Sequence, residues 1–186
     1  MIEAMGAGQT VRGIARFKSE IRFKEAVLLG DAQRPSEEVI VQQRICFLLT
    51  ADSLEAVEAR NKWKKLNVSY IALPTHTLAG TLKSIIEVGK LLRKEKEAHD
   101  VYLRIQETFR LVKKNAPQKM DKKVVFVVGR DPMYVAGVGS HLGEFVQMAG
   151  GKLLPPSGDS YAMVSIEALL QWQPDVIIEL AEHDTS

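Results

Sequence analysis

The 186-residue sequence has little of what marks several large classes of protein. It has one cysteine, so no disulfide can form within the chain. No apolar stretch approaches the roughly 20 residues that a membrane-spanning helix needs, and residues 1–6 lack the basic start and apolar core of a signal peptide. The net charge of +2 gives no bias toward nucleic acid, which we do not expect as a partner. The chain is therefore either cytoplasmic or exported with a signal that has been removed.

Residues suited to catalysis or metal binding are also sparse. The cysteine, Cys46, lies in the apolar run 45–49, which predicts a buried and unreactive thiol. His141 and Glu144 have i,i+3 spacing on a predicted helix and could share a metal, but no third ligand has suitable spacing. The sequence contains neither a G-x-S-x-G elbow nor a P-loop. We predict no catalytic residue and no metal site.

What the sequence does contain is an alternation of short apolar runs with helical patterns. Continuous apolar runs are typical of strands buried on both faces, as in parallel sheets. The expected strands are Val11–Ala15, Ile45–Leu49, Ser69–Leu73, Val124–Val128 and Val176–Ile178, and the expected helices between them are Ser36–Gln43, Ser53–Leu66, Ser140–Ala149 and Ser165–Trp172. This alternation predicts an α/β fold with right-handed crossovers.

The middle of the chain differs from both ends. Residues 78–115 contain no proline, only two glycines and two apolar helical stripes in different phases, which predicts two consecutive helices with a joint near Arg93. The second helix, 95–115, would be about 30 Å long at 1.5 Å per residue. We therefore expect an N-terminal lobe over residues 1–93, a linking helix over 94–117 and a C-terminal lobe over 118–186.

Ligands of open α/β sheets bind beyond the carboxyl ends of the strands. Arg16 and Phe17 follow the first expected strand, and Thr50 follows the second. Thr75 and His76 follow the third, Arg130 and Tyr134 follow the strand at 124–128, and Glu179 and Glu182 follow the last. These residues are candidates to line a cleft between the lobes.

Several runs also resemble a known family. They are Glu3–Gly8 and Pro35–Ile40 in the first half, and Gly129–Gly137, Ser140–Glu144, Met148–Gly151, Val164–Leu170 and Gln173–Ile178 in the second. Together they make the chain similar to helical-backbone periplasmic binding proteins, which serve ABC importers of cobalamin, haem or ferric siderophores. The resemblance implies two Rossmann-like lobes with mainly parallel sheets, joined by a long rigid helix.

The resemblance also implies roles for individual residues. The ligand contacts would be Arg16, Phe17, Thr50, Arg130, Tyr134, Gly139, Ser140 and Tyr161, with Tyr134 and Tyr161 on loops. Arginine would pair with a ligand carboxylate, and aromatic rings would cover the flat face of a corrin or porphyrin. Glu38 and Glu167, one on each lobe, would dock to arginines of the permease dimer. No covalent cofactor and no enzymatic activity are implied.

Relative to that family, a strand before Ile2 and further elements after residue 180 are missing. We therefore expect a chain shortened at both ends, with an incomplete C-terminal lobe and an exposed sheet edge through which a homodimer could form. The family implies a periplasmic or extracellular location, while a cytoplasmic one stays open. Two alternatives also remain: a metal- or cofactor-binding enzyme or sensor on a similar scaffold, and a dimerising remnant that binds nothing.

Overall fold

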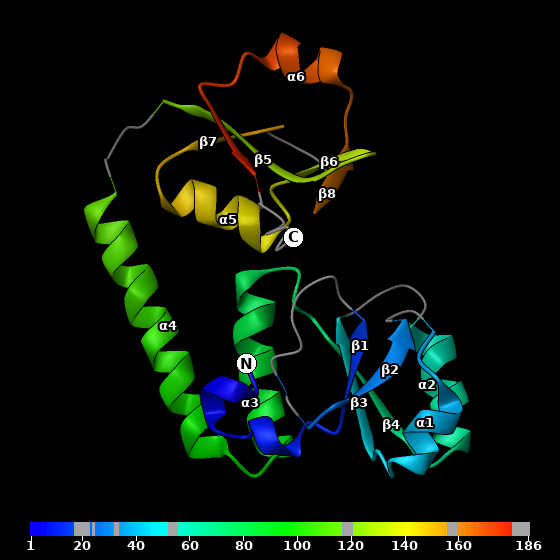
Figure 1. The fold of residues 1–186 in the computed structure, drawn as a ribbon. Coiled ribbons are helices and arrows are strands. Elements are labelled where there is room, and N and C mark those ends of the chain that lie inside the picture. Colours follow the sequence, from blue (N-terminus) through cyan, green and yellow to red (C-terminus); the bar gives the residue numbers. More distant parts are fainter. Residues whose placement is uncertain are drawn as a thin grey trace. The chain divides into compact units, whose positions relative to one another are not determined.

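The computed structural model describes residues 1–16, 23, 25–31, 34–51, 56–116, 121–155 and 160–179, with the backbone alone for Arg16 and residues 56–58. The chain forms two compact units (Figure 1). Unit 1 comprises Met1–Pro74 and Lys83–Val101, and unit 2 comprises Thr75–Leu82 and Tyr102–Ser186. Among the described residues, no helix has both the length and the apolar character that crossing a bilayer requires.

Unit 1 is built from short parallel strand pairs and helices. Its elements are the 3-10 helices η1 (Glu3–Met5) and η2 (Gly8–Thr10), the strands β1 (Gly13–Arg16), β2 (Val27–Asp31), β3 (Phe47–Ala51) and β4 (Ser69–Leu73), and the helices α1 (Glu37–Gln42) and α2 (Ala56–Lys65). β1 pairs with β2, and β3 pairs with β4, both in parallel. Helix α1 begins after Ser36, whose hydroxyl accepts a hydrogen bond from the Val39 N–H and so caps the helix.

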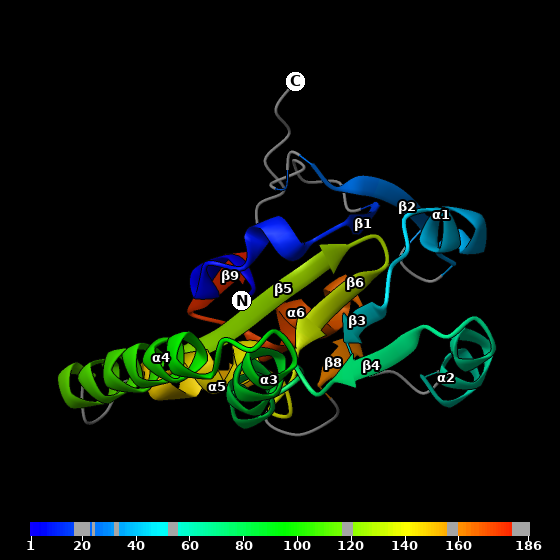
Figure 2. The ribbon, with the colours of Figure 1, turned by 90° about the horizontal axis from the view of Figure 1, so that it is seen from below.

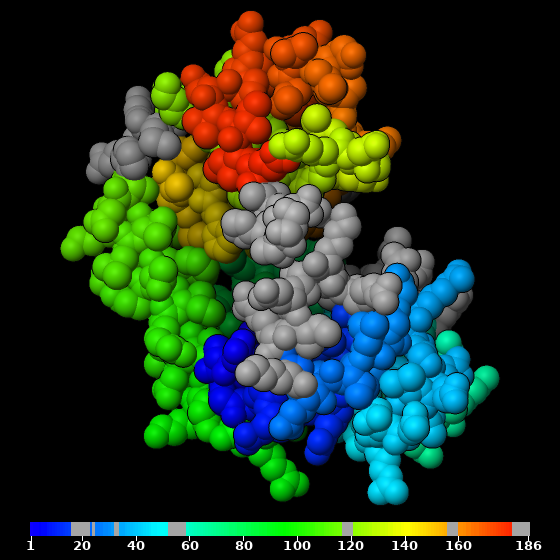
Figure 3. Space-filling model, viewed as in Figure 1, coloured from blue at the N-terminus to red at the C-terminus, as the bar shows by residue number. Residues whose placement is uncertain are grey.

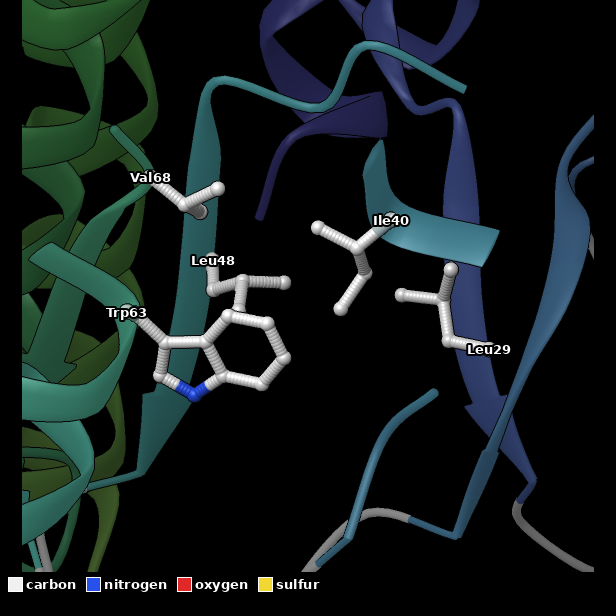
Figure 4. Close-up of a cluster of buried hydrophobic side chains, with 5 residues drawn as sticks. All are labelled: Leu29, Ile40, Leu48, Trp63 and Val68. Atoms are coloured by element: carbon white, nitrogen blue, oxygen red, sulfur yellow. The ribbon is translucent and has the colours of Figure 1, made fainter. Parts of the chain in front are cut away.

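The core of unit 1 brings helix side chains onto the strands (Figure 4). Its buried members are Leu29, Ile40, Leu48, Trp63 and Val68. Figure 4 shows the Trp63 indole beside Leu48, with Ile40 and Leu29 facing them. Trp63 is 2% exposed, so this large side chain contributes much of the apolar area that holds α2 on the strands.

Helices α3 (Leu78–Leu91) and α4 (Glu95–Asn115) are joined at Arg93, which has a positive φ of 54°. The prediction of two consecutive helices with a joint near Arg93 is confirmed. Gly89 is buried on α3, and a Cβ added there would lie 2.2 Å from the Cβ of Ala98 on α4. The two helices therefore approach each other closely because residue 89 has no side chain.

Unit 2 contains a five-stranded mixed sheet. Its elements are the strands β5 (Lys123–Arg130), β6 (Met133–Ala136), β7 (Lys152–Leu154), β8 (Tyr161–Met163) and β9 (Val176–Glu179), and the helices α5 (His141–Met148) and α6 (Ile166–Trp172). β7 and β9 run parallel to β5, whereas β6 is antiparallel to both β5 and β8. Figure 2 shows β5 and β6 side by side. The α/β fold class with mainly parallel strands is confirmed, and the hairpin β5–β6 is an addition that the sequence reading missed.

The two faces of this sheet carry separate cores. One face, covered by α5, buries Val124, Phe126 and Ala136 with Val146 of the helix. The other face, covered by α6, holds a second cluster, comprising Val125, Val127, Val135 and Leu154 with the partly buried Leu169 and Trp172. Figure 1 shows the two helices on opposite sides of the sheet. The run at 124–127 is apolar throughout because both of its faces are buried.

Candidate functional site

The carboxyl edge of the sheet in unit 2 brings several strand ends together. β5 ends at Arg130, β9 at Glu179 and β8 at Met163, and these three strands run in the same direction. Tyr134 lies near the start of the antiparallel strand β6, so it reaches the same edge. In α/β proteins this edge is where ligands bind, and it is the candidate site of unit 2.

Tyr134 and Tyr161 lie in strands, not on loops as the sequence reading expected. Those strands are only four and three residues long, so their apolar residues are too few to mark a strand in the sequence. Across the β6–β8 ladder, Tyr134 is opposite Met163 and Tyr161 is opposite Ala136. Directly opposite residues share a face of the sheet, so Tyr134, Tyr161 and Met163 all lie on the α5 face. We call these three residues the aromatic patch.

The aromatic patch is accessible. Tyr134 is 39% exposed and Met163 is 68% exposed. Tyr161 is half-buried, and burial raises the pKa of its phenol, so the hydroxyl stays protonated and can donate a hydrogen bond. Tyr134 and Met163 stand opposite each other at the carboxyl end of β8 and offer exposed apolar surface there, while Tyr161 begins β8 on the same face, two residues before Met163.

Arg130 makes a bidentate ion pair with Glu179 across the ends of β5 and β9. Its Nε donates to Glu179 Oε1, and its Nη2 donates to Oε2 at 2.6 Å. The hydrogen bonds from Arg130 lower the pKa of the Glu179 carboxyl, which therefore stays ionised. Because Glu179 is paired with Val127 in the ladder, this ion pair belongs to the α6 face of the sheet. The structure thus places Arg130 at the same edge as the aromatic patch but on the opposite face.

The loop with Gly139 and Ser140 is held from several sides. Ser140 is fully buried, and its hydroxyl donates to the Gly137 carbonyl at 2.8 Å and accepts from the Gly143 N–H at 3.0 Å, capping α5. The Ser160 hydroxyl donates to the Gly139 carbonyl at 3.0 Å. A Cβ at Gly143 would lie 2.3 Å from the Gly137 oxygen, which explains a glycine there. Ser140 holds the loop and has no exposed surface to offer a ligand.

Of the three ligand residues predicted in unit 1, only Thr50 has a described side chain. Arg16 is the last residue of β1, but its side chain and the whole of Phe17 lie outside the described residues. Thr50 is half-buried inside β3 opposite Ala72, because this strand begins and ends two residues later than expected. Cys46 is exposed just before the strand, so the prediction of a buried thiol is wrong.

His141 and Glu144, the pair considered as metal ligands, form hydrogen bonds to the segment that leads into α3. The backbone N–H of His141 donates to the His76 carbonyl at 2.6 Å, and the Glu144 carboxylate accepts from the Leu78 N–H at 3.2 Å. The first turn of α5 thereby caps the start of α3. Within the described ranges, no group of three or more His, Cys, Asp or Glu residues could hold a metal ion.

The two predicted docking carboxylates both lie in the first turn of a helix. Glu38 is exposed on α1. Glu167 is exposed on α6, where its own backbone N–H, then the Ser165 hydroxyl, lower its pKa and keep it charged. Both positions suit contact with a basic partner, and the role itself stays a prediction.

Two hollows in unit 2 lie along α4, with volumes of about 400 and 320 Å³. The larger is lined by Leu111, Val112 and Ala149 among others, and the smaller is lined mainly by apolar side chains that include Phe109 and Phe145. Neither is lined by a predicted ligand residue, and neither has a charged side chain to orient a ligand. The carboxyl edge therefore remains the candidate site.

Comparison with known proteins agrees with this fold. Residues 51–185, more than half of the chain, match the profile of the family described as periplasmic binding protein. The chain belongs to the periplasmic binding protein family, which assigns it a solute-binding role. A search among curated proteins finds no significant match.

Solved structures of similar fold include three binding proteins. The haem-binding protein HutB of Vibrio cholerae is 21% identical with a TM-score of 0.80, over 96% of this chain and 70% of that one. IsdE of S. aureus, complexed with haem, is 22% identical with a TM-score of 0.80, over 97% and 71%. The vitamin B12-binding protein BtuF of Vibrio cholerae is 20% identical with a TM-score of 0.73, over 96% and 71%. At these identities the likeness is one of fold.

Two members of the candidate site were outside the predicted ligand set. Met163 left no signal in the sequence because β8 has three residues and was not predicted. Glu179 was expected at the rim of the cleft because it directly follows the apolar run at 176–178, but it was not among the expected ligand contacts. Its pairing with Arg130 could not be predicted, because 49 residues separate the two in the chain.

Proposed function

We propose that this protein is the solute-binding component of an ABC importer and that it captures a corrinoid, haem or a ferric siderophore for delivery to the permease. The observation that carries the proposal is the aromatic patch, which has Tyr134 and Met163 at the carboxyl edge of the unit 2 sheet and Tyr161 beside them on the same face, in a chain of the periplasmic binding protein family. Three of its structural relatives bind haem or vitamin B12. No covalent step is involved.

The patch suits a broad, flat metal chelate. The rings of Tyr134 and Tyr161 offer apolar faces of the kind that stack on conjugated macrocycles. The thioether of Met163 is flexible and polarisable, which lets it follow an irregular ligand surface. The protonated Tyr161 hydroxyl adds one hydrogen-bond donor.

Delivery would use the two exposed helix-start carboxylates. Glu38 on α1 and Glu167 on α6 are free to meet arginines of a permease, where they would guide encounter and set orientation more than add affinity. Such a receptor works in the periplasm or at the extracellular surface, and we propose that location for this protein.

Among the described residues β9 pairs with β5 alone, so its other edge is unpaired there, and its side chains at Val176, Ile177 and Ile178 are exposed; Figure 3 shows β9, drawn red, at the surface. An open edge of this kind is prone to pair with another chain. Binding measurements should therefore be accompanied by the solution mass of the protein, so that a dimer is recognised.

The test is a binding screen with cyanocobalamin, haemin, a ferric hydroxamate and a ferric catecholate, read by tryptophan fluorescence and thermal shift. We expect saturable binding of one chelate class. Tyr134→Ala and Tyr161→Ala should each weaken it by at least about fivefold, since aromatic anchors dominate binding energy.

Tyr102→Ala is the matched control, because Tyr102 is a half-buried tyrosine on helix α4 and not in the sheet. It should bind like the unmodified protein. Folded protein that binds none of the four chelates would refute the proposal. Binding that survives both patch substitutions would move the site elsewhere.

A further inference from the structure

The ion pair between Arg130 and Glu179 at the carboxyl edge limits how Arg130 can bind a ligand carboxylate. Arg130 is the residue best suited to meet a ligand carboxylate, yet Glu179 already holds it by two short hydrogen bonds. The Arg130 side chain is 79% exposed and that of Glu179 is 35% exposed, so both remain within reach of a molecule bound at the edge.

The geometry leaves part of the guanidinium available. Glu179 occupies the side formed by Nε and Nη2. Arginine has five N–H donors, and in the described part of the chain the structure gives Nη1 no partner. A ligand carboxylate could therefore approach only end-on, close to the negative charge of Glu179, or would have to displace Glu179 from the side.

The carboxylates near Arg130 also disfavour binding of an anionic ligand. Asp131 follows Arg130 directly and is exposed, so the described residues at the end of β5 and β9 include two carboxylates, Asp131 and Glu179, and one guanidinium. Among these described residues, an anionic ligand meets no excess of positive charge.

We propose that Glu179 is a specificity-determining residue, which competes with acidic groups of the ligand for Arg130 and so weakens binding of tetrapyrroles that carry free carboxylates. This inference rests on the proposed function. It predicts that neutralising Glu179 releases one side of Arg130 and improves binding of an acidic tetrapyrrole, without affecting the same macrocycle when its carboxylates are esterified.

The experiment titrates haemin and haemin dimethyl ester into unmodified protein and Glu179→Gln, following the Soret band. Glutamine keeps the shape of the side chain and removes its charge. We expect Glu179→Gln to bind haemin about two- to fivefold more tightly, the scale of an exposed ion pair, and to bind the ester unchanged. The gain should vanish in an Arg130→Gln background, as a coupled pair requires.

Glu107→Gln is the matched control, because Glu107 makes the same bidentate pair with Arg110 on α4. It should leave both affinities unchanged. The inference is overturned if Glu179→Gln binds haemin equally or more weakly, or if the ester gains as much as haemin. It is also overturned if unmodified protein binds no haemin, whereas the proposed function is then decided by the other chelates in the screen.

Discussion

Gly89 lies where helices α3 and α4 touch, and replacing it with alanine tests that contact. An alanine Cβ would lie 2.2 Å from the Ala98 Cβ and 3.2 Å from the Lys94 carbonyl oxygen. Non-bonded carbons pack at about 3.5–4.0 Å, so the helices would have to separate by more than about 1 Å. The Lys94 N–H donates to the Gly89 carbonyl at 2.7 Å, and this hydrogen bond at the joint would be strained as well.

Two effects of opposite sign compete at this position. Alanine in a helix interior is normally more stable than glycine by about 0.5–1 kcal/mol, whereas overpacking a buried contact costs about 1–3 kcal/mol. We expect the second to prevail, with a net loss of about 1–2 kcal/mol and a Tm lower by about 2–8 °C. Urea unfolding followed by far-UV circular dichroism measures the change.

A second substitution provides the control for this prediction. Ala98→Gly removes the methyl group with which the new Cβ of Gly89→Ala would clash. The free energy of unfolding of the double variant should therefore fall less than the sum of the losses in the two single variants. Equal or higher stability of Gly89→Ala, or strict additivity in the double variant, would refute the close approach of α3 and α4.

Three further predictions concern other parts of the chain. Trp63→Ala should cost about 3–5 kcal/mol because it empties the unit 1 core; a loss below about 1 kcal/mol in urea unfolding would contradict that packing. The Lys123 backbone N–H donates to Asp175 at 2.7 Å and lowers the pKa of this carboxyl, so Asp175 stabilises the fold above its unfolded pKa and this contribution is lost as pH falls through the folded value. Asp175→Asn should therefore be less stable than unmodified protein at neutral pH, with a difference that shrinks in acid; a difference independent of pH would argue against the hydrogen bond. Cys46 is exposed, so a thiol reagent should modify it in native protein without denaturant, and protection until unfolding would show that the residue is buried.

The larger elements could be predicted from the sequence because their patterns are long. The two apolar stripes in residues 78–115 predicted α3 and α4, and Asn115 is the last residue of α4, as expected. The apolar runs at 69–73 and 124–128 predicted β4 and most of β5, and in β5 the run is apolar because both of its faces are buried. The helices expected over 140–149 and 165–172 are α5 and α6, and in the structure Ser140 and Ser165 cap their starts.

The candidate site was less predictable, because it depends on strand register. β6, β7 and β8 have three or four residues each, too few for a period to show. That Tyr134 and Tyr161 share a face, and that Arg130 lies on the other, follows only from which residues stand opposite one another. Cys46 shows the same limit, since a residue in an apolar run can still fall just before the strand where burial begins.

β5 is the strand on which the rest of the sheet depends. Three other strands pair directly with it, β7 and β9 in parallel and β6 antiparallel, while β8 joins only through β6. Opening β7, β8 or β9 leaves the remaining pairs intact, but releasing β5 removes every pair except β6–β8 and opens both cores. The amide hydrogens of 124–127 should accordingly be among the slowest in unit 2 to exchange with solvent, and their exchange should report complete unfolding of this unit, not local fraying.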